Sequence, residues 1–360
     1  MLWQIWWLAA LMQASVPKLT AEPAVEWERL FSPTQGWLVS DCAYSVNLGN
    51  DRILWLYDDT FIGRIQEGKR IGVAMVRNSI AIQKEQRPET AQVRFVWGRV
   101  GEKQPSDFVK PPDGVGWFWF GHGLVDKSKL LLFLWQFEPS DAPSPFNFRL
   151  RASWLATVEN YTDESEDWRF KFVRLPFFLQ TKDQTVCFGN AVVSDGEWVF
   201  VYGIKEDKRR FPLKRGLKIA RVPSGRLDDF GAWRFYTKGS WDTDWQNAED
   251  FGSDLGFEFT VGFVPSLNKF ALVYSPADLS PVVKVRLSPT PFGRWSEPFF
   301  AYECPQWKWH PSVFCYAAKA HPSLSAPNEL LVTYASNSSD FRLLLEDARF
   351  YFPHFVRLRF

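Results

Sequence analysis

The sequence is poor in the residues that build metal centres. It holds only 4 His and 4 Cys among 360 residues, and no two cysteines form a Cys-x-x-Cys pair. This argues against a zinc ribbon. No His-x-His pair and no Asp-x-Asp-x-Asp-Gly run occurs either, so no metal-binding motif is present. We predict no cofactor, although a structural Ca²⁺ ion in a central channel stays compatible with the sequence.

The motifs of two other large protein classes are also missing. There is no Gly-x-Ser-x-Gly run and no Gly-rich phosphate loop, which argues against a serine hydrolase and a nucleotide-binding protein. An excess of positive charge is absent as well, because 42 Lys and Arg face 41 Asp and Glu. A nucleic-acid partner is therefore not expected, since such proteins carry a basic surface.

Long apolar runs are missing except at the N-terminus, which reads LWQIWWLAALM over residues 2–12. This run is too short to span a bilayer and fits the apolar core of a secretory signal peptide, although the basic n-region is missing. Ala14 and Ala21 are candidate cleavage points. We predict a signal peptide at residues 1–21 and a secreted, periplasmic or cell-surface protein without a stable membrane span. The alternative is an uncleaved, buried N-terminal strand or helix.

Export would permit disulfide bonds, but the spacing of the four cysteines does not assign any. Cys304 and Cys315 are close enough in sequence to bridge a local loop. Free buried thiols are an equally valid interpretation of the same residues.

Aromatic residues, in contrast, are abundant, with 19 Trp, 10 Tyr and 33 Phe. Such side chains suit the half-buried surfaces of strands, and Trp and Tyr also suit stacking on flat ligand faces. The apolar runs are short and are broken by Gly, Pro, Asn and Asp. This pattern is typical of an all-β protein in which most aromatic side chains pack in the core.

One unit recurs five times along the chain: a strand, a polar turn, and a second strand that ends in an aromatic residue. The second strands end at Tyr57, Trp135, Tyr202, Tyr274 and Tyr334. The intervals leave room for two outer strands per unit, for example residues 78–82 with 93–97, and 217–222 with 233–236. Four-stranded units around an axis form a β-propeller. We predict one five-bladed β-propeller with a central funnel over residues 22–360; the alternative is a pair of β-sandwiches.

The first strand of each propeller blade lines the central channel, so ligand-binding residues are expected on these strands. Candidates at or near them are Asp41, His122, Asn190, Glu258 and His321.

The first hairpin gives the sharpest prediction. Asp41 and Asp59 lie equally far from Asn50, the centre of its turn. Without a bulge they would face each other, with Cβ atoms about 4.5–5.5 Å apart. By strand alternation Asp58 would point to the other face. Two close carboxylates repel, so the pKa of one rises, which supplies the acid and the ionised partner that glycoside hydrolysis needs. The alternative is that both aspartates are structural.

Other residues complete the candidate site. Glu258 is a candidate general acid or substrate ligand, and Arg77 could hold a carboxylate ionised. Trp119 is a candidate for sugar stacking. Candidate ligands for sugar hydroxyls are Asn78, His122, Asn190, His321 and Asn337. Each could instead be a packing or hydrogen-bonding residue of the blades.

Several motifs carry a family likeness in the right order. They are Asp41-Cys-Ala-Tyr-Ser-Val, Arg52-Ile-Leu-Trp-Leu-Tyr-Asp-Asp-Thr-Phe-Ile-Gly63, Arg77-Asn-Ser-Ile-Ala-Ile, Phe188-Gly-Asn-Ala, Lys319-Ala-His-Pro-Ser-Leu-Ser and Thr333-Tyr-Ala-Ser-Asn-Ser. From about residue 36 to the C-terminus, the chain resembles the families of domains of unknown function numbered 4185 and 5005.

The resemblance implies a five-bladed propeller akin to arabinanases and other furanosidases. Relatives include the endo-D-arabinanases of glycoside hydrolase family 183, whose two catalytic aspartates match Asp41 and Asp59. The sequence departs from the pattern at Asp58, where relatives often have Gly. We therefore predict a monomeric glycoside hydrolase that acts on a furanosidic, arabinan-like polysaccharide or oligosaccharide. Two alternatives are a non-catalytic propeller that binds carbohydrate or another surface, and a scaffold whose channel is filled by side chains.

Overall fold

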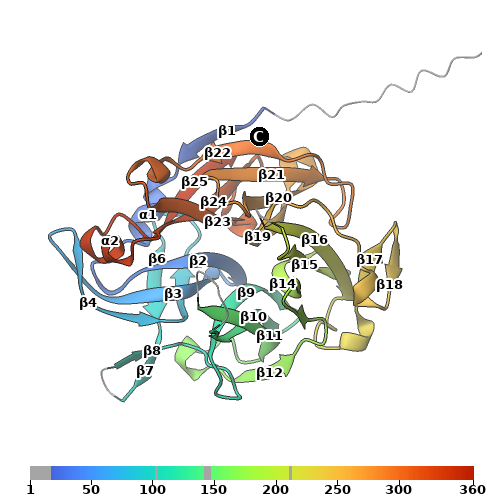
Figure 1. The fold of residues 1–360 in the computed structure, drawn as a ribbon, viewed down its shortest axis with the longest axis horizontal. Coiled ribbons are helices and arrows are strands. Elements are labelled where there is room, and N and C mark those ends of the chain that lie inside the picture. The colour runs from blue at the N-terminus through green and yellow to red at the C-terminus, as the bar shows by residue number, and fades with distance from the viewer. Residues whose placement is uncertain (1–17, 102–103, 142–146, 211–212) are drawn as a thin grey trace, which may run out of the picture.

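The computed structural model describes residues 18–101, 104–141, 147–210 and 213–360. Five antiparallel sheets follow one another around a central axis in chain order (Figure 1). Each contains a hairpin whose second strand carries one of the repeated aromatic residues. The predicted five-bladed β-propeller is therefore confirmed, and the pair of sandwiches is not the architecture. The prediction that these strands end at the aromatic residue is wrong, because every one of them continues past it, β3 as far as Gln66.

The first two blades follow the predicted order of strands. Blade 1 runs β2 (Gln35–Gly49), β3 (Arg52–Gln66), β5 (Ser79–Lys84) and β6 (Gln92–Val96), with β4 (Lys69–Val76) also paired to β3. Blade 2 runs β9 (Trp117–Asp126), β10 (Lys129–Pro139), β11 (Phe148–Val158) and β12 (Phe170–Arg174). A separate ribbon, β7 (Gly98–Val100) with β8 (Gln104–Ser106), lies between them in sequence.

The other three blades vary at their edges. Blade 3 runs β13 (Leu179–Gln180), β14 (Gln184–Ser194), β15 (Trp198–Asp207), β16 (Lys214–Pro223), β17 (Arg234–Thr237) and β18 (Ser240–Asp242). Blade 4 runs β19 (Leu255–Val264), β20 (Lys269–Pro276), β21 (Val282–Ser288) and β22 (Phe299–Glu303). Blade 5 runs β23 (Val313–Ala320), β24 (Glu329–Ser338), β25 (Phe352–Arg359) and β1 (Thr20–Pro23).

Helical structure is confined to short segments. The α-helices are α1 (Val25–Leu30) and α2 (Phe341–Glu346), and the 3₁₀ turns are η1 (Ser165–Asp167), η2 (Phe230–Ala232), η3 (Trp245–Asn247), η4 (Pro265–Leu267), η5 (Pro305–Lys308) and η6 (Pro322–Leu324). In the part of the chain that the structure describes, no helix combines the length and apolar character needed to cross a membrane.

The inner strands of the five blades form the wall of the channel. β2 contacts β9, β9 contacts β14, β14 contacts β19, β19 contacts β23, and β23 contacts β2. The ring therefore closes through the first hairpin strand of every blade, as the repeat predicts. Side chains that lie at the same end of these strands meet, however far apart they are in the sequence.

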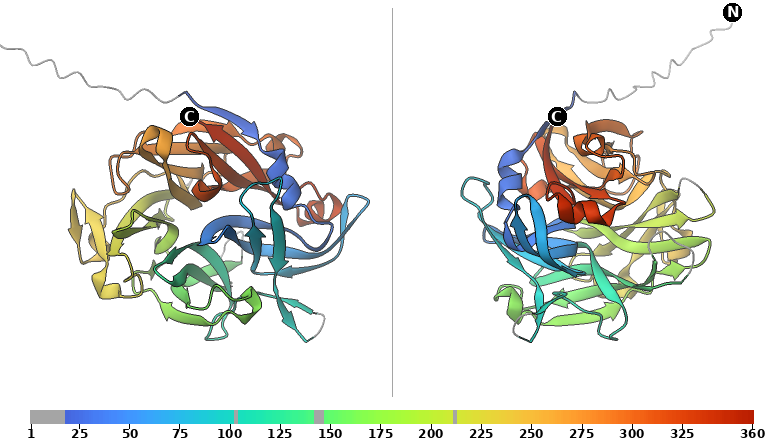
Figure 2. Two further views of the ribbon diagram at one scale, coloured as in Figure 1. Left: turned by 180° about the vertical axis from the view of Figure 1, so that it is seen from behind. Right: turned by 60° about the vertical axis from the view of Figure 1, so that its left-hand side comes forward.

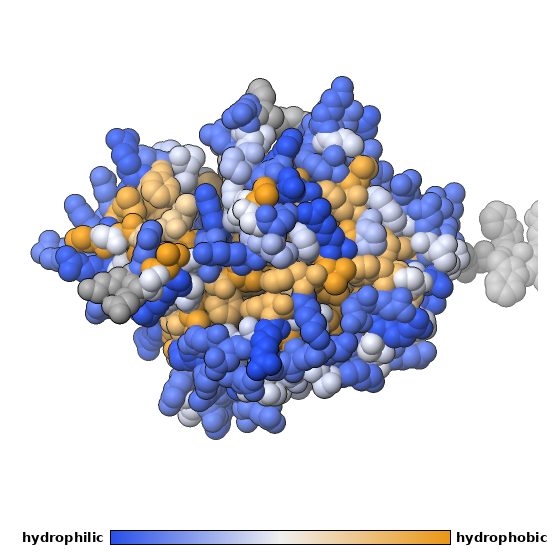
Figure 3. Space-filling view, turned by 90° about the horizontal axis from the view of Figure 1, so that it is seen from below, coloured by the Kyte–Doolittle hydropathy of each residue, from blue (hydrophilic) through white to orange (hydrophobic). Residues whose placement is uncertain are grey.

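The aromatic residues pack mostly between and within the blades. Trp37, Trp55, Trp135 and Trp233 are at most 2% exposed. At the outer edge of blade 2, Val173 in β12 is 48% exposed. Seen from below, the side of the molecule where β12 lies in Figure 1, hydrophobic residues form a band between polar flanks (Figure 3). All four cysteines are buried free thiols, so Cys304 and Cys315 do not form a bridge.

The N-terminal strand completes the outer edge of blade 5. β1 pairs with β25, with Thr20 opposite Arg359 and Pro23 opposite Val356, and Figure 2 shows it beside the C-terminal strand. Residues 1–17, most of the predicted signal peptide, lie outside the described residues. β1 begins two residues before the predicted domain start at residue 22. The first and last described segments therefore build one sheet together.

Deleting residues 1–23 is expected to lower the free energy of unfolding by about 1–4 kcal/mol, because the hydrogen bonds of β1 to β25 are lost and each contributes about 1 kcal/mol. Urea denaturation would measure the loss. Glu22→Gln is the matched control, since it removes the ion pairs of Glu22 with Arg357 and Arg359 but keeps the strand. A truncated chain as stable as the parent would show that the pairing of β1 with β25 does not stabilise the propeller.

Candidate active site

The register of the first hairpin brings three aspartates together. Ser40 pairs with Thr60 and Cys42 pairs with Tyr57, so Asp41 alone opposes both Asp58 and Asp59. This is a β-bulge, which the assumption of a regular hairpin did not include. A second irregularity follows at Cys42 and Ala43, whose φ angles are 71° and 62°.

Asp58 has different partners from Asp59. It is 5% exposed and accepts a hydrogen bond of 2.6 Å from the backbone N–H of Phe120. Burial, with the charges of Glu258 and Asp41, raises the pKa of Asp58 well above its usual range. Asp58 is therefore a buried carboxyl group, beside the pair that the sequence singled out, whose surroundings favour its protonated form.

Asp41 is held as a protonated acid. Its Oδ2 accepts a hydrogen bond of 2.5 Å from the Tyr316 hydroxyl, and its Oδ1 is buried without a partner among the described residues. Burial raises the pKa of Asp41 to about 8, and the charges of Asp59 and Glu258 act in the same direction. Tyr316 and Lys319 oppose this shift. At neutral pH this carboxyl group therefore carries a proton that it could donate.

Asp59 has a different environment. Its Oδ1 accepts a hydrogen bond of 3.1 Å from Trp119 Nε1, and its Oδ2 lies 3.2 Å from Arg77 Nη1. Burial raises the pKa of Asp59, while Arg77 and Trp119 act to lower it. The Asp59 side chain is 21% exposed and that of Arg77 is 33% exposed. Asp59 is thus the aspartate whose charge is compensated by an arginine.

Arg77 is itself fixed by its neighbours. Its guanidinium group lies 4.4 Å from the ring centroid of Trp117, and its backbone N–H donates to Asp107 Oδ1 at 2.7 Å. Trp119 packs against Phe137 with ring centroids 4.4 Å apart. The two donors that hold Asp59 are therefore held by aromatic side chains of blade 2.

Glu258 forms a buried ion pair that the sequence did not predict. Its Oε2 accepts from Lys319 Nζ, and the two side chains are 14% and 0% exposed. Lys319 also donates to the carbonyl of Ala317 at 3.0 Å and lies 4.6 Å from the ring centroid of Tyr44. The only signal for Lys319 was its place in the Lys-Ala-His-Pro motif of the last repeat. Glu258 is an ion-paired charge that raises the pKa of Asp41.

The residues at the centre of the channel do not fit a Ca²⁺ ion. Ligand atoms of Cys42, Asp58 and Glu258 lie within 4.8 Å of one another. Ca²⁺ requires six to eight oxygen ligands, whereas this group contains a thiol. Burial raises the pKa of Cys42 well above its usual range, so it stays protonated. The ammonium group of Lys319 already contacts Glu258. We therefore assign no metal ion to this site.

Both predicted histidines lie in the wall of the channel. His122 is 9% exposed, and its ring contacts the Ser45 carbonyl at 3.2 Å and the Val192 N–H at 3.1 Å. His321 is fully buried between the hydroxyls of Ser45 and Thr333. Burial lowers the pKa of both histidines. These positions favour the alternative stated above, neutral groups that join blades, over contacts with a substrate.

The predicted asparagines also make internal hydrogen bonds. Asn78 is fully buried and bridges Val109 and Phe118 through their backbone groups. Asn190 is fully buried and donates to the carbonyl of Phe257 at 2.7 Å. These two side chains join neighbouring segments of the propeller, and neither offers an exposed amide to a sugar.

Asn337 acts through a tyrosine that sequence reasoning missed. Its Nδ2 donates to the Tyr316 hydroxyl at 3.1 Å, and that hydroxyl donates to Asp41. A second missed residue, Tyr351, donates to the backbone carbonyl of Asp59 at 2.5 Å. Neither tyrosine belongs to a motif, and both come from blade 5 and its loop. Only the closed ring places them beside the first hairpin.

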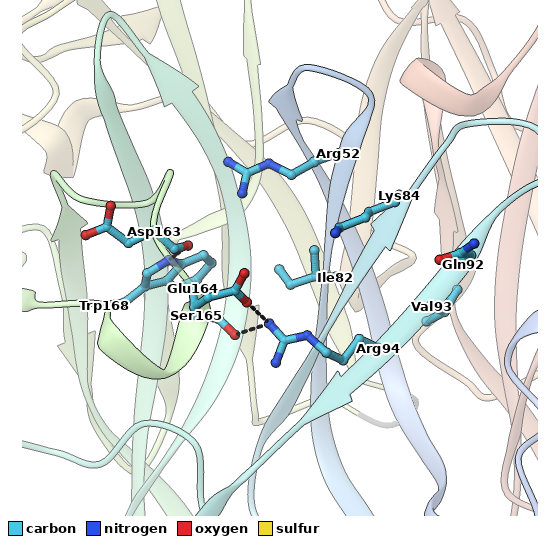
Figure 4. Close-up of a pocket in the computed structure, with 10 residues that line it drawn as sticks. All are labelled: Arg52, Ile82, Lys84, Gln92, Val93, Arg94, Asp163, Glu164, Ser165 and Trp168. Atoms are coloured by element: carbon cyan, nitrogen blue, oxygen red, sulfur yellow. Dashed lines mark hydrogen bonds and ion pairs between the residues drawn. The ribbon is translucent and has the colours of Figure 1, made fainter.

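Two cavities are described, and neither is lined by Asp41 or Asp59. The larger, about 400 Å³, lies between blade 1 and the loop that precedes β12 (Figure 4). The smaller is lined by residues of blades 3 and 4. Asp41 and Asp59 are both partly exposed residues.

Comparisons with known proteins agree with the architecture. A structure from Bacteroides ovatus, described only provisionally as a hydrolase, matches with a TM-score of 0.74 and 18% identity, covering 94% of this chain and 90% of that chain. This likeness shows the shared fold. A protein of unknown function from Dyadobacter fermentans matches with a TM-score of 0.48 and 9% identity, over 96% of this chain and 100% of that one.

A GH43_1 enzyme from Xanthomonas citri matches with a TM-score of 0.47 and 11% identity, over 93% of this chain and 92% of that chain. A search of curated protein sequences finds no match. The family model described as "Domain of unknown function (DUF5005)" matches residues 25–359, which include every strand of the five blades except β1, and both candidate aspartates. The chain therefore belongs to the DUF5005 family.

Proposed function

We propose that this protein is a glycoside hydrolase that uses Asp41 as general acid and Asp59 as its ionised partner. The observation that carries the proposal is the divided environment of the two carboxyl groups. Burial and neighbouring charges raise the pKa of Asp41 to about 8, while Arg77 and Trp119 oppose the rise for Asp59. An acid and an ionised carboxylate in one site are what glycosidic cleavage requires.

In this mechanism the proton of Asp41 passes to the glycosidic oxygen as the bond from that oxygen to the anomeric carbon breaks. Asp59 either attacks the anomeric carbon or takes a proton from the attacking water. Tyr316 and Asn337 orient the acid, since Tyr316 donates to Asp41 and Asn337 donates to Tyr316. Glu258 is a positioning residue whose charge favours the protonated form of Asp41.

The substrate class we propose is a furanosidic, arabinan-like polysaccharide or oligosaccharide. Support comes from the motifs around Asp41 and Asp59, which resemble those of the endo-D-arabinanases. Digesting a panel of arabinans, xylans and galactans with the purified protein and analysing the products by chromatography tests it. Release of arabinose-containing products is expected. Cleavage of only pyranosidic glycans would contradict the furanosidic assignment and leave the paired-carboxylate mechanism standing.

A carbohydrate-binding propeller without catalysis is the second candidate. It is favoured by one observation, that Oδ1 of Asp41 is buried without a partner among the described residues and the Asp59 side chain is only 21% exposed. The same panel separates the two functions, because a binding module would retain a glycan on an affinity column without releasing products. Products that depend on Asp41 would exclude it.

We also propose that the protein is exported, on the basis of the apolar run at residues 2–12. Expressing the full chain in a bacterial host and sequencing the N-terminus of the product tests this proposal. Cleavage after Ala14 would leave β1 intact, whereas cleavage after Ala21 would remove Thr20 and Ala21 from it.

Replacing Arg77 with Met is expected to move the acidic limb of the pH profile of kcat/KM to higher pH. The reason is that Arg77 lowers the pKa of Asp59, which must be ionised to act. Rates measured over the acidic and neutral range would show the shift. Arg99→Met, at an exposed arginine in β7, is the matched control. An unchanged acidic limb in the Arg77 variant would mean that Asp59 is not the ionised catalytic group.

A further inference from the structure

The 400 Å³ cavity lies far from the candidate active site. It is lined by Arg52 at the start of β3, by residues of β5 and β6, and by the loop that leads into β12 (Figure 4). Arg52 begins β3 and Asp59 lies in the middle of the same strand, about 23 Å away at about 3.3 Å per residue. A ligand here would not contact Asp41 or Asp59.

The acidic side chains of this cavity already have partners. Glu164 Oε2 accepts from Arg94 Nη2 at 2.8 Å, and Asp163 Oδ2 accepts from Asn160 Nδ2 at 3.0 Å. The other terminal nitrogen of Arg94 contacts Glu166 at 2.5 Å. The positive charge of Arg94 is therefore matched by carboxylates within the protein.

Two cations at the cavity, Arg52 and Lys84, make no ion pair with a carboxylate among the described residues. Arg52 donates only to backbone carbonyls, those of Thr162 at 3.3 Å and Tyr161 at 3.4 Å. Lys84 is exposed, and its ammonium group makes no hydrogen bond or ion pair with the residues that the structure describes. Figure 4 shows both side chains on the same side of the cavity, near Ile82. An anionic group placed between them would supply the missing negative charge.

The rest of the lining suits the body of a small polar molecule. Ile82, Val93 and the ring of Trp168 form apolar wall, while the exposed amide of Gln92 and the free oxygen of Glu164 can bind hydroxyl groups. The volume is within the range of small-molecule sites. We propose that this cavity binds a sugar that carries a carboxylate, with the carboxylate between Arg52 and Lys84 and the ring over Ile82.

This site is independent of the proposed hydrolase activity. Isothermal titration of the purified full-length protein with D-glucuronate at low ionic strength tests it, with D-glucose and inorganic phosphate as comparison ligands. Binding of glucuronate is expected, with no binding of glucose. The affinity should fall at least tenfold in Lys84→Gln, a variant with no internal contact to lose. Lys182→Gln, at an exposed lysine outside the cavity, should bind like the parent.

Three results would overturn the proposal. One is the absence of glucuronate binding in the millimolar range. Another is equal affinity of the parent and the Lys84→Gln variant. The third is phosphate binding as tight as that of glucuronate, because the cavity would then recognise any anion rather than an acidic sugar. Activity on arabinan is not part of the readout, so its loss or presence leaves this test unaffected.

Discussion

Asp41→Asn is expected to lower kcat on the cleaved glycan by about 10²–10⁴-fold, the range that general acid catalysis contributes. Asparagine keeps the size and the hydrogen bond from Tyr316 but has no proton to give to the glycosidic oxygen. Since the pKa of Asp41 is about 8, kcat of the parent should also fall as pH rises through this value and the acid ionises. Steady-state rates across neutral and alkaline pH would measure both effects.

Asp58→Asn is the matched control for this substitution. Asp58 precedes Asp59 in β3, but it is only 5% exposed, and its Oδ1 accepts a hydrogen bond from the N–H of Phe120. We expect its replacement to leave most of the activity in place. If Asp41→Asn and Asp59→Asn both kept full activity, the assignment of the two catalytic aspartates would be wrong.

Whereas Asp41→Asn is expected to lower activity, it is expected to raise stability in alkaline buffer. A carboxyl group whose pKa is raised on folding stabilises the fold while it is protonated and loses that contribution as pH rises from its unfolded value through its folded value. For Asp41 this window runs from the ordinary carboxyl value of 3.8 to about 8. Asn cannot ionise, so the variant should unfold at a higher temperature than the parent in alkaline buffer. Differential scanning calorimetry would detect the difference.

Lys319→Met is expected to destabilise the propeller by about 3–5 kcal/mol, the effect of removing one member of a buried ion pair. Lys319 is fully buried, and its loss leaves the carboxylate of Glu258 without its counter-ion. The hydrogen bond to the Ala317 carbonyl is lost as well. Urea denaturation of the variant and the parent would measure the change in the free energy of unfolding.

The control for this prediction is the double variant Lys319→Met with Glu258→Gln. Removing both charges avoids an unpaired buried carboxylate, so the double variant should regain much of the lost stability. If it were as unstable as the single variant, the loss would come from packing rather than from charge. Lys319 also lowers the pKa of Asp41, so the alkaline limb of the activity profile should move to higher pH in the single variant.

The fold could be predicted because its information is local and repeated. Each unit carries its own turn and an aromatic residue in its second strand, and five such units are compatible with few architectures. The predicted outer strands at residues 78–82 and 93–97 correspond to β5 and β6, and those at 217–222 and 233–236 to β16 and β17. The predicted turn centred on Asn50 is confirmed, since Ser45 pairs with Trp55 and Val46 with Leu54.

The details of the site were less accessible from the sequence. The bulge opposite Asp41 depends on backbone conformation at Cys42 and Ala43, and both residues adopt positive φ without being Gly or Asn. His122 and Asn190 were predicted on the correct strands, β9 and β14, and His321 follows directly after β23. Whether such side chains face a ligand or a neighbouring blade depends on what packs against them, which no local pattern encodes.

By itself, the sequence determined the five repeated hairpins, the position of Asp41 and Asp59 on the first of them, and the family. Only the tertiary structure decided which aspartate carries a proton. Tyr316, Lys319 and Glu258 come from blades 4 and 5, and Arg77 and Trp119 from blades 1 and 2. The pKa of a buried carboxyl group depends on the charges and hydrogen bonds within a few ångströms. Those neighbours meet only when the ring of blades has closed.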